Sequence, residues 1–141
     1  MKPEKIFPPL VLEEAKNLRK YAKKEEINRL EFRVLYSESR TGCVYGQMTG
    51  DCFSERAQFL IENSCSKVYK AMPGEALCDN AELNGPPKKY KGDRQLSYWS
   101  PIEVFISKNA KENNYELNEE LVKFIKAPLS FIDKIKRIFR F

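Results

Sequence analysis

The clearest strand signal in the chain is the stretch PIEVFI, residues 101–106. It opens with a proline, and the residues that follow are mostly of the apolar, β-favouring kind found in strands. We therefore predict a strand over residues 102–106. The fold class depends on this segment, because the other strand signals are shorter or weaker.

Two further segments are expected to join that strand in a sheet. Residues 30–34, LEFRV, alternate between apolar and polar side chains with a period of two, which predicts a strand over residues 30–36. A polar link leads from there to the apolar run 43–45, which can pair with it as a hairpin. Together these segments predict a small antiparallel sheet of about three strands.

Helical periodicity occurs on either side of these segments. Apolar residues recur at helical spacing over residues 9–24 and 54–65, and Ser54 is a suitable N-cap for the second of these helices. Asn118 is a suitable cap for a helix over residues 118–126, and Pro128 suits the first turn of a fourth helix. Residues 72–93 are rich in glycine and proline and are expected to form a long loop. The predicted fold class is α+β, with the sheet packed against three to four helices.

Length and composition are those of one soluble domain. The chain has 141 residues, of which 42% are hydrophobic and 32% charged, enough apolar material for one core. We expect a single α+β domain over residues 1–126, with residues 127–141 as a basic amphipathic helix belonging to the same domain. No apolar run approaches about 18 residues, and the first residues lack the apolar centre of a signal peptide. A cytoplasmic protein, or one attached to a membrane surface, is expected.

The cysteines and the absence of histidine restrict the chemistry. No histidine occurs, which excludes Ser-His-Asp and Cys-His catalysis as well as histidine metal sites. The cysteines stand at positions 43, 52, 65 and 78, spacings that do not match paired zinc ligands. We therefore expect reduced thiols, no metal, no cofactor and no enzymatic activity. The alternative is a small enzyme that uses a cysteine or a carboxylate pair such as Glu38 and Asp51.

The basic excess lies entirely at the C-terminal end. The net charge is +5, and residues 123–141 hold six of the 25 basic residues but one of the 20 acidic ones. As a helix, this end segregates its side chains into an apolar arc and a basic side. The apolar arc is Phe131, Ile132, Ile135, Ile138 and Phe139, and the basic residues are Lys134, Lys136, Arg137 and Arg140. Such a helix either docks on its own core or binds an anionic membrane surface or a partner's groove.

The segment 36–56 is the candidate binding site. It places three glycines, several hydroxyl groups and two arginines just before a helix N-terminus, where free N–H groups attract anions. The spacing is not that of a P-loop or a dinucleotide-binding loop. The residues expected to contact a protein partner or a small anionic ligand are Tyr36, Arg40, Tyr45, Gln47, Ser54 and Arg56. The alternative is a purely structural turn; nucleic acid is not an expected partner, and the sequence leaves the oligomeric state open.

One resemblance bears on this segment. The run CVYGQMTGDC at residues 43–52, with SERA at 54–57 and SPIEV at 100–104, resembles a group of small uncharacterised proteins from phages and prophages. The group has no assigned chemistry, so the resemblance implies no functional residue. What it implies is a binding role, such as interference with a host factor.

Overall fold

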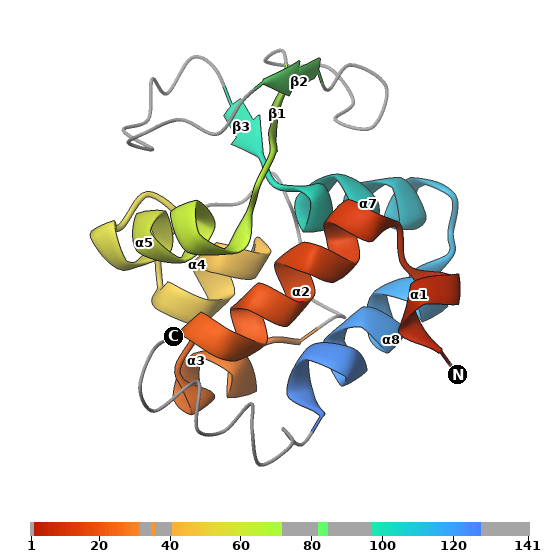
Figure 1. Ribbon diagram of the computed structural model, residues 1–141, viewed down its shortest axis with the longest axis horizontal. Coiled ribbons are helices and arrows are strands. Elements are labelled where there is room, and N and C mark those ends of the chain that lie inside the picture. The colour runs from red at the N-terminus through yellow and green to blue at the C-terminus, as the bar shows by residue number, and fades with distance from the viewer. Residues whose placement is uncertain (1, 32–34, 36–40, 72–81, 85–96, 128–141) are drawn as a thin grey trace.

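The computed structural model describes residues 2–31, 35, 41–71, 82–84 and 97–127. Within this part of the chain there are seven helices and three short strands (Figure 1). The helices are α1 (Pro3–Ile6), α2 (Pro9–Tyr21), α3 (Lys24–Asn28), α4 (Val44–Thr49), α5 (Glu55–Ser64), α7 (Pro101–Lys111) and α8 (Tyr115–Lys126). The strands are β1 (Val68–Ala71), β2 (Glu82–Asn84) and β3 (Ser97–Trp99).

The α+β prediction is wrong, because the described residues form mainly helices. Residues 102–106 lie in α7, residues 44 and 45 form the start of α4 with Cys43 as its N-cap, and the described part of 30–36 is not in a strand. The strands that do occur are elsewhere. They pair antiparallel in the order β2-β1-β3, with Tyr69 opposite both Leu83 and Trp99, and lie at one end of the helical body (Figure 1).

Helix α7 shows why the strand prediction failed. Ser100 caps the helix by accepting a hydrogen bond from the backbone N–H of Glu103, and Pro101 occupies the first helical position, where its missing N–H costs nothing. Ile102 and Ile106 are four residues apart and both are buried, as on one face of a helix. Over six residues the period of a helix is hard to distinguish from the period of a strand, and the cap at Ser100 favours the helix.

Helix α4 was also predicted as a strand. Its N-cap is Cys43, whose sulfur accepts a hydrogen bond from the backbone N–H of Gly46 at 3.3 Å. The helix ends after six residues at Gly50, whose φ of 94° is the left-handed conformation that glycine adopts at little cost. The apolar run 43–45 therefore forms the cap and first residues of a short helix, four of whose six residues are buried.

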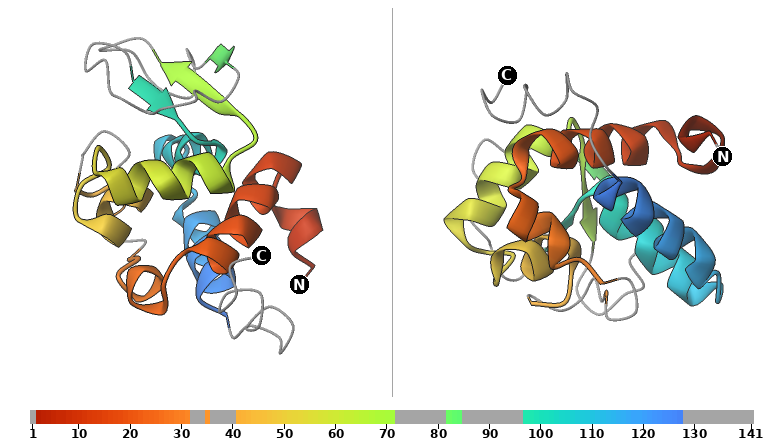
Figure 2. Two further views of the ribbon diagram at one scale, coloured as in Figure 1. Left: turned by 60° about the vertical axis from the view of Figure 1, so that its left-hand side comes forward. Right: turned by 90° about the horizontal axis from the view of Figure 1, so that it is seen from below.

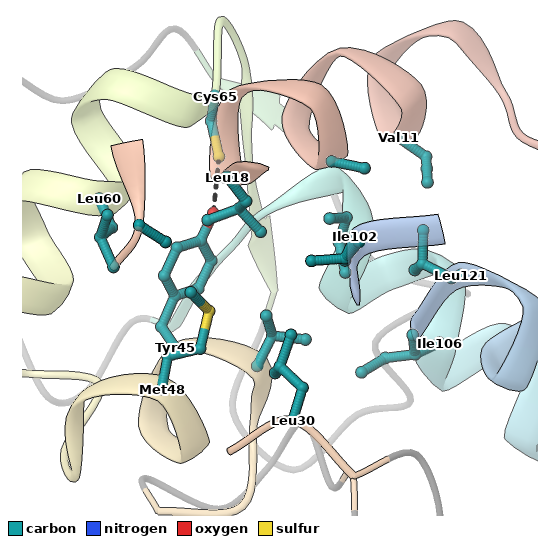
Figure 3. Packing of buried hydrophobic residues seen from close by; sticks show 14 of the residues in the cluster. Val11, Leu18, Leu30, Tyr45, Met48, Leu60, Cys65, Ile102, Ile106 and Leu121 are labelled. Atoms are coloured by element: carbon teal, nitrogen blue, oxygen red, sulfur yellow. Dashed lines mark hydrogen bonds between the residues drawn. The ribbon is translucent and has the colours of Figure 1, made fainter. Parts of the chain in front are cut away.

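The core is centred on α2, which packs against α1, α5, α7 and α8. In the right-hand view of Figure 2, α2 runs along one edge of the molecule, with α5 near its C-terminal end and α7 and α8 near its N-terminal end. Figure 3 shows the side chains of Leu18, Tyr45, Met48, Leu60 and Ile102 close together in the interior. The buried hydrophobic cluster includes residues from Phe7 to Ile125, so all the described helices contribute to one core or border it.

Two of the predicted helices are present in the structure, unlike the predicted strands. The helix over 9–24 is confirmed as α2, which ends at Tyr21, and the helix over 54–65 is confirmed as α5 with Ser54 as its N-cap. The cap at Asn118 is wrong: α8 begins at Tyr115, and Asn118 is buried within it, donating to the carbonyl of Ile106 and accepting from Asn109. Of the C-terminal helix predicted over 127–141, Ala127 is the C-cap of α8, and the other residues lie outside the described part of the chain. The loop predicted over 72–93 also lies largely outside it, but residues 82–84 form β2.

Among the described helices, none combines the length and the apolar character needed to cross a membrane.

Candidate functional site

Tyr45, which was predicted to contact a ligand or partner, lies in the core. Its side chain is 2% exposed, and its hydroxyl donates a hydrogen bond of 2.5 Å to Glu14 and contacts the sulfur of Cys65 at 3.5 Å (Figure 3). The interpretation of Tyr45 as contact area for a ligand is therefore wrong. The ring fills the interior because α4 is a helix, which turns Tyr45 inward together with Val44 and Met48.

Gln47 and Ser54 have local structural contacts. The Gln47 side chain accepts from the backbone N–H of Glu31 at 3.0 Å and donates to the carbonyl of the same residue at 3.3 Å. The Ser54 hydroxyl accepts from the backbone N–H of Ala57 at 3.1 Å. One of the N–H groups expected to attract an anion at the start of α5 is thus already bonded to Ser54 itself.

Arg56 forms a two-point ion pair with Glu26 of α3. Its Nε donates to one carboxylate oxygen at 2.9 Å and its terminal nitrogen to the other at 2.7 Å, and that nitrogen also donates to the backbone carbonyl of Tyr21. Burial acts to raise the pKa of Glu26, but the hydrogen bonds from Arg56 and Lys23 and the charge of Arg56 outweigh it and lower that pKa. The charge of Arg56, which was expected to contact a partner or an anionic ligand, is therefore already paired with Glu26, although the Arg56 side chain remains 28% exposed.

Tyr36 and Arg40 fall outside the described residues, as does the whole apolar and basic set from Phe131 to Arg140. Of the predicted binding residues, Arg56 is the one that the structure brings into a surface cluster of a kind suited to binding.

That cluster lies where the C-terminal part of α2 meets α5, and consists of Lys20, Tyr21, Arg56 and Phe59; we call it the α2–α5 cluster. The rings of Tyr21 and Phe59 meet edge to face, with centroids 6.4 Å apart. The Arg56 guanidinium lies 5.1 Å from the centre of the Phe59 ring, and the Lys20 ammonium 5.1 Å from the centre of the Tyr21 ring. Cations at this distance are attracted to the negative ring faces, so the four side chains support one another.

Phe59 is the exposed member of the α2–α5 cluster. Among the side chains that the structure describes, the large hydrophobic ones left exposed are Phe59, at 37%, and Tyr115, at 50%. Phe59 lies outside the stripe of Ala57, Leu60 and Ile61 that packs α5 on the core. An aromatic ring off the buried stripe of a confirmed helix is a signal that sequence reasoning could have found, and did not.

A second group of polar residues lies in the interior. Glu14 is fully buried and accepts hydrogen bonds from the hydroxyl of Tyr45 and, at 2.8 Å, from the backbone N–H of Ile102 in the first turn of α7. It is also hydrogen-bonded to the side chain of Ser100. Burial raises the pKa of Glu14, and these hydrogen bonds offset the rise in part. Burial also raises the pKa values of Tyr45 and Cys65, so this group favours the neutral forms.

Glu103 of α7 bonds to the start of α4, just as Glu14 bonds to the start of α7. Its buried carboxylate accepts from the backbone N–H of Val44, the first residue of α4, at 2.9 Å. The helix N-termini of α4 and α7 are thus each bonded to a carboxylate from another helix, an arrangement favoured by the partial positive charge at those ends. Sequence reasoning missed both residues, although Glu14 stands within the apolar stripe of α2 and Ser100 to Glu103 has the spacing of a capping box.

The described cysteines Cys43, Cys52 and Cys65 are present as thiols. The hydrogen bond with the Cys52 side chain and burial raise the pKa of the Cys43 thiol well above its ordinary value. Since the thiolate is the nucleophilic form, Cys43 does not have the surroundings of an activated catalytic cysteine. Within the described residues, no group of three or more side chains suited to hold a metal ion occurs.

Comparison of the chain with protein-family models, with curated proteins and with solved structures finds no match.

Proposed function

We propose that this chain is a non-enzymatic, cytoplasmic binding protein that recognises a protein partner through the α2–α5 cluster. The observation that carries the proposal is the Phe59 ring, exposed on the surface between the Arg56 guanidinium and the Tyr21 ring. Aromatic residues and arginine are the types most enriched in protein interfaces and in their energetic hot spots.

The α2–α5 cluster has a second property of hot spots, which is that it is held in place before binding. Arg56 is fixed by both oxygens of Glu26 and by the carbonyl of Tyr21, and Phe59 packs against the ring of Tyr21. A side chain that is already ordered loses less conformational entropy when a partner binds. The rigid group therefore favours binding more than isolated exposed residues would.

The surrounding charges indicate the chemistry of the partner. Lys16 lies one turn before Lys20 on α2 and is exposed, so α2 offers two cations beside the rings. The charge of Arg56 is largely matched by Glu26, which leaves the lysines as the attraction for acidic side chains. We expect a partner that places an apolar side chain on Phe59 and carboxylates near Lys16 and Lys20.

A reducing compartment is part of the same proposal, because Cys43, Cys52 and Cys65 are thiols, which persist in the cytosol. The membrane-anchor alternative rests on residues 129–141, outside the described part of the chain, and becomes an outcome of the test below. The enzyme alternative receives no support from Glu14 or Cys43, since both are buried with raised pKa values.

The experiment compares two exposed aromatic residues. Phe59→Ala removes the ring from the α2–α5 cluster, whereas Tyr115→Ala removes a more exposed ring at the start of α8, on the other side of the molecule (Figure 1). Proteins retained from cytosol by the immobilised chain are identified by mass spectrometry, and the affinity of the retained partner is then measured with each purified variant. Phe59→Ala should weaken binding about 30-fold, the effect of a hot-spot residue worth about 2 kcal/mol, while Tyr115→Ala should change it less than threefold.

Three outcomes would contradict the proposal. Binding could survive Phe59→Ala, it could be lost with Tyr115→Ala instead, or the unmodified chain could bind anionic lipid vesicles and no protein. Circular dichroism and thermal unfolding of each variant show whether the fold is kept. We expect it to be kept, because a side chain as exposed as Phe59 contributes little to the core.

A further inference from the structure

We propose that residues 131–141 form a helix that folds back along α8 and covers a hollow in its surface. The hollow has a volume of about 340 Å³ and lies beside the last turns of α8. The residues that line it are Glu119, Val122, Lys123, Lys126 and Ala127. The occupant of the hollow is then a segment of this same chain, and the α2–α5 cluster takes no part in the contact.

One stripe along α8 combines the hollow with an exposed aromatic ring. Tyr115, Glu119, Val122 and Lys126 follow one another at intervals of three or four residues, which places them on one side of the helix. The Tyr115 ring is 50% exposed at one end of this stripe, and Val122 borders both the core and the hollow. An elongated apolar element that lies along the stripe covers both residues.

The described chain ends at the rim of the hollow. Ala127 lines the hollow and is the C-cap of α8, with a ψ of 148° that leaves the helical conformation. Ser130 and Asp133 have the spacing of a capping box, which predicts that a new helix begins after Ser130. Residues 127–130 then form the connection, whose length falls within the range of about two to five residues that joins antiparallel helices. Such a short connection gives a high effective concentration, which favours this contact over one between two molecules.

The segment has the length and the apolar arc that the stripe requires. A helix over residues 131–141 is about 16 Å long, close to the length of α8, so it reaches from the hollow back to the level of Tyr115. Because both helices rise equally per residue, Ile135 comes opposite Val122, beside the hollow. The apolar arc that faces α8 consists of Phe131, Ile132, Ile135, Ile138 and Phe139.

The charges along the two helices suit antiparallel packing. Helix α8 is acidic in its first half and basic in its last turn, with the charged residues Glu116, Glu119, Glu120, Lys123 and Lys126. The segment that follows has Asp133 near its start, and its later charged residues are Lys134, Lys136, Arg137 and Arg140. When the segment folds back, its basic end lies along the acidic end of α8, and Asp133 lies near the basic last turn. Opposite charges at this range attract each other, which favours the antiparallel arrangement.

Hydrogen exchange of the full chain tests whether the segment is covered. A helix this short is marginal in water when it is isolated, so protection of its amides requires docking. The amides of residues 135–141 should exchange at least about tenfold more slowly than in an unstructured peptide. Ile135→Gln removes an apolar side chain from the arc and should return these amides to the unstructured rate. Arg137→Gln, the matched control on the opposite side of the helix, should change the rates less than about twofold, and glutamine lowers the helix propensity of neither variant.

Crosslinking with a carbodiimide, which joins an amine to a neighbouring carboxylate, tests where the segment lies. Lys134 and Lys136 stand on either side of the apolar arc. Within one molecule, they should link to Glu119 or Glu120 of α8. The protection of residues 135–141 should also persist when the protein is diluted, because no second molecule takes part.

Several results would overturn the proposal. The amides of residues 135–141 could exchange at the unstructured rate, or they could keep their protection in Ile135→Gln. They could be protected only after phosphatidylserine vesicles are added, the result for a membrane anchor, or lose protection on dilution, the result for a contact between two copies. The crosslinks could join the segment to an element other than α8. Exchange and crosslinking of the unmodified chain give an answer even if a variant does not fold.

Discussion

Two regions of this protein each bury a glutamate, and they do so in opposite electrostatic surroundings. Glu14 is 0% exposed where α2, α4 and α7 meet, and its hydrogen-bond partners there are the neutral groups of Tyr45, Ser100 and Ile102. Glu26 is 5% exposed at the junction of α3 with α5, and both its oxygens accept from Arg56. The pKa of Glu14 is raised and that of Glu26 is lowered.

The difference shows that burial alone does not decide what a carboxyl group contributes. In both places burial opposes the charged form, but a guanidinium fork bonded to both oxygens is strong enough to reverse the shift. Glu14 therefore connects α2 to α4 and α7 through hydrogen bonds from neutral groups, and burial there favours its neutral form. Glu26 serves as a counterion that orients Arg56 for the α2–α5 cluster.

The largest loss in the free energy of unfolding is expected for Glu14→Ala. Truncation leaves a cavity and removes the acceptor for the Tyr45 hydroxyl and for the N–H of Ile102, both buried. Each unsatisfied buried group costs about 1–3 kcal/mol, so the free energy of unfolding should fall by about 4 kcal/mol in all. Urea denaturation followed by circular dichroism measures the loss, and a decrease below about 1 kcal/mol would show that the interior group is dispensable.

Glu14→Gln is the matched control, and it removes the titration. A carboxyl whose pKa is raised in the folded state contributes stability that is fully present below its ordinary pKa of 4.5 and is lost as the pH rises through the folded value. Raising the pH above 4.5 should therefore lower the stability of the unmodified protein relative to Glu14→Gln. The same pH dependence in both proteins would mean that Glu14 does not titrate as the geometry indicates.

A smaller effect is expected for Arg56→Ala, which leaves the Glu26 carboxylate nearly buried without its cation. We expect a loss of about 2 kcal/mol in the free energy of unfolding at neutral pH, because the pair lies between the surface and the interior in exposure. Since the pKa of Glu26 is lowered, its contribution is present above about pH 4.5 and is lost as the pH falls through the folded value. The unmodified protein and Arg56→Ala should therefore converge in stability in acid, the reverse of the Glu14 case.

Arg56→Lys sharpens this comparison. Lysine keeps the charge but cannot donate to both carboxylate oxygens in the planar geometry of a guanidinium. We expect the stability of this variant to lie midway between the unmodified protein and Arg56→Ala. Full stability in Arg56→Lys would show that charge, and not the two-point geometry, fixes Glu26.

The sequence predicted the long helices because they carry their own signals. Residues 9–24 and 54–65 show apolar residues at helical spacing over several turns, and Ser54 is a strong cap. Residues 101–106 and 43–45 were misassigned because short apolar runs fit both periods. What decides them is the cap at Ser100 and the fit of Tyr45 into the core, the second of which depends on helices distant in the sequence.

The candidate site was less predictable for the same reason. The sequence proposed Arg56 as a binding residue because it is charged and lies near a helix start, but its partner Glu26 is 30 positions away, and nothing local links the two. Phe59 and Glu14 did carry local signals, as an aromatic residue outside a buried stripe and an acid inside one. The contacts that give these residues their roles join helices that are distant in the sequence, α2 with α5 and α7, and α3 with α5.

The smallest effect on the free energy of unfolding is expected for an exposed ion pair on α8, which is compared here with the partly buried pair of Arg56 and Glu26. Lys123 on α8 lies 3.7 Å from Glu119 and 3.6 Å from Glu120, and its side chain is 65% exposed. Water competes for all three groups, so Lys123→Ala should change the free energy of unfolding by less than about 0.5 kcal/mol. In 1 M salt, where the screening length falls to about 3 Å, even that difference should vanish, whereas the effect of Arg56→Ala should persist in large part. Equal salt sensitivity in the two variants would mean that the Arg56 pair is as solvated as the Lys123 pair, and that its two-point contact with Glu26 does not protect it.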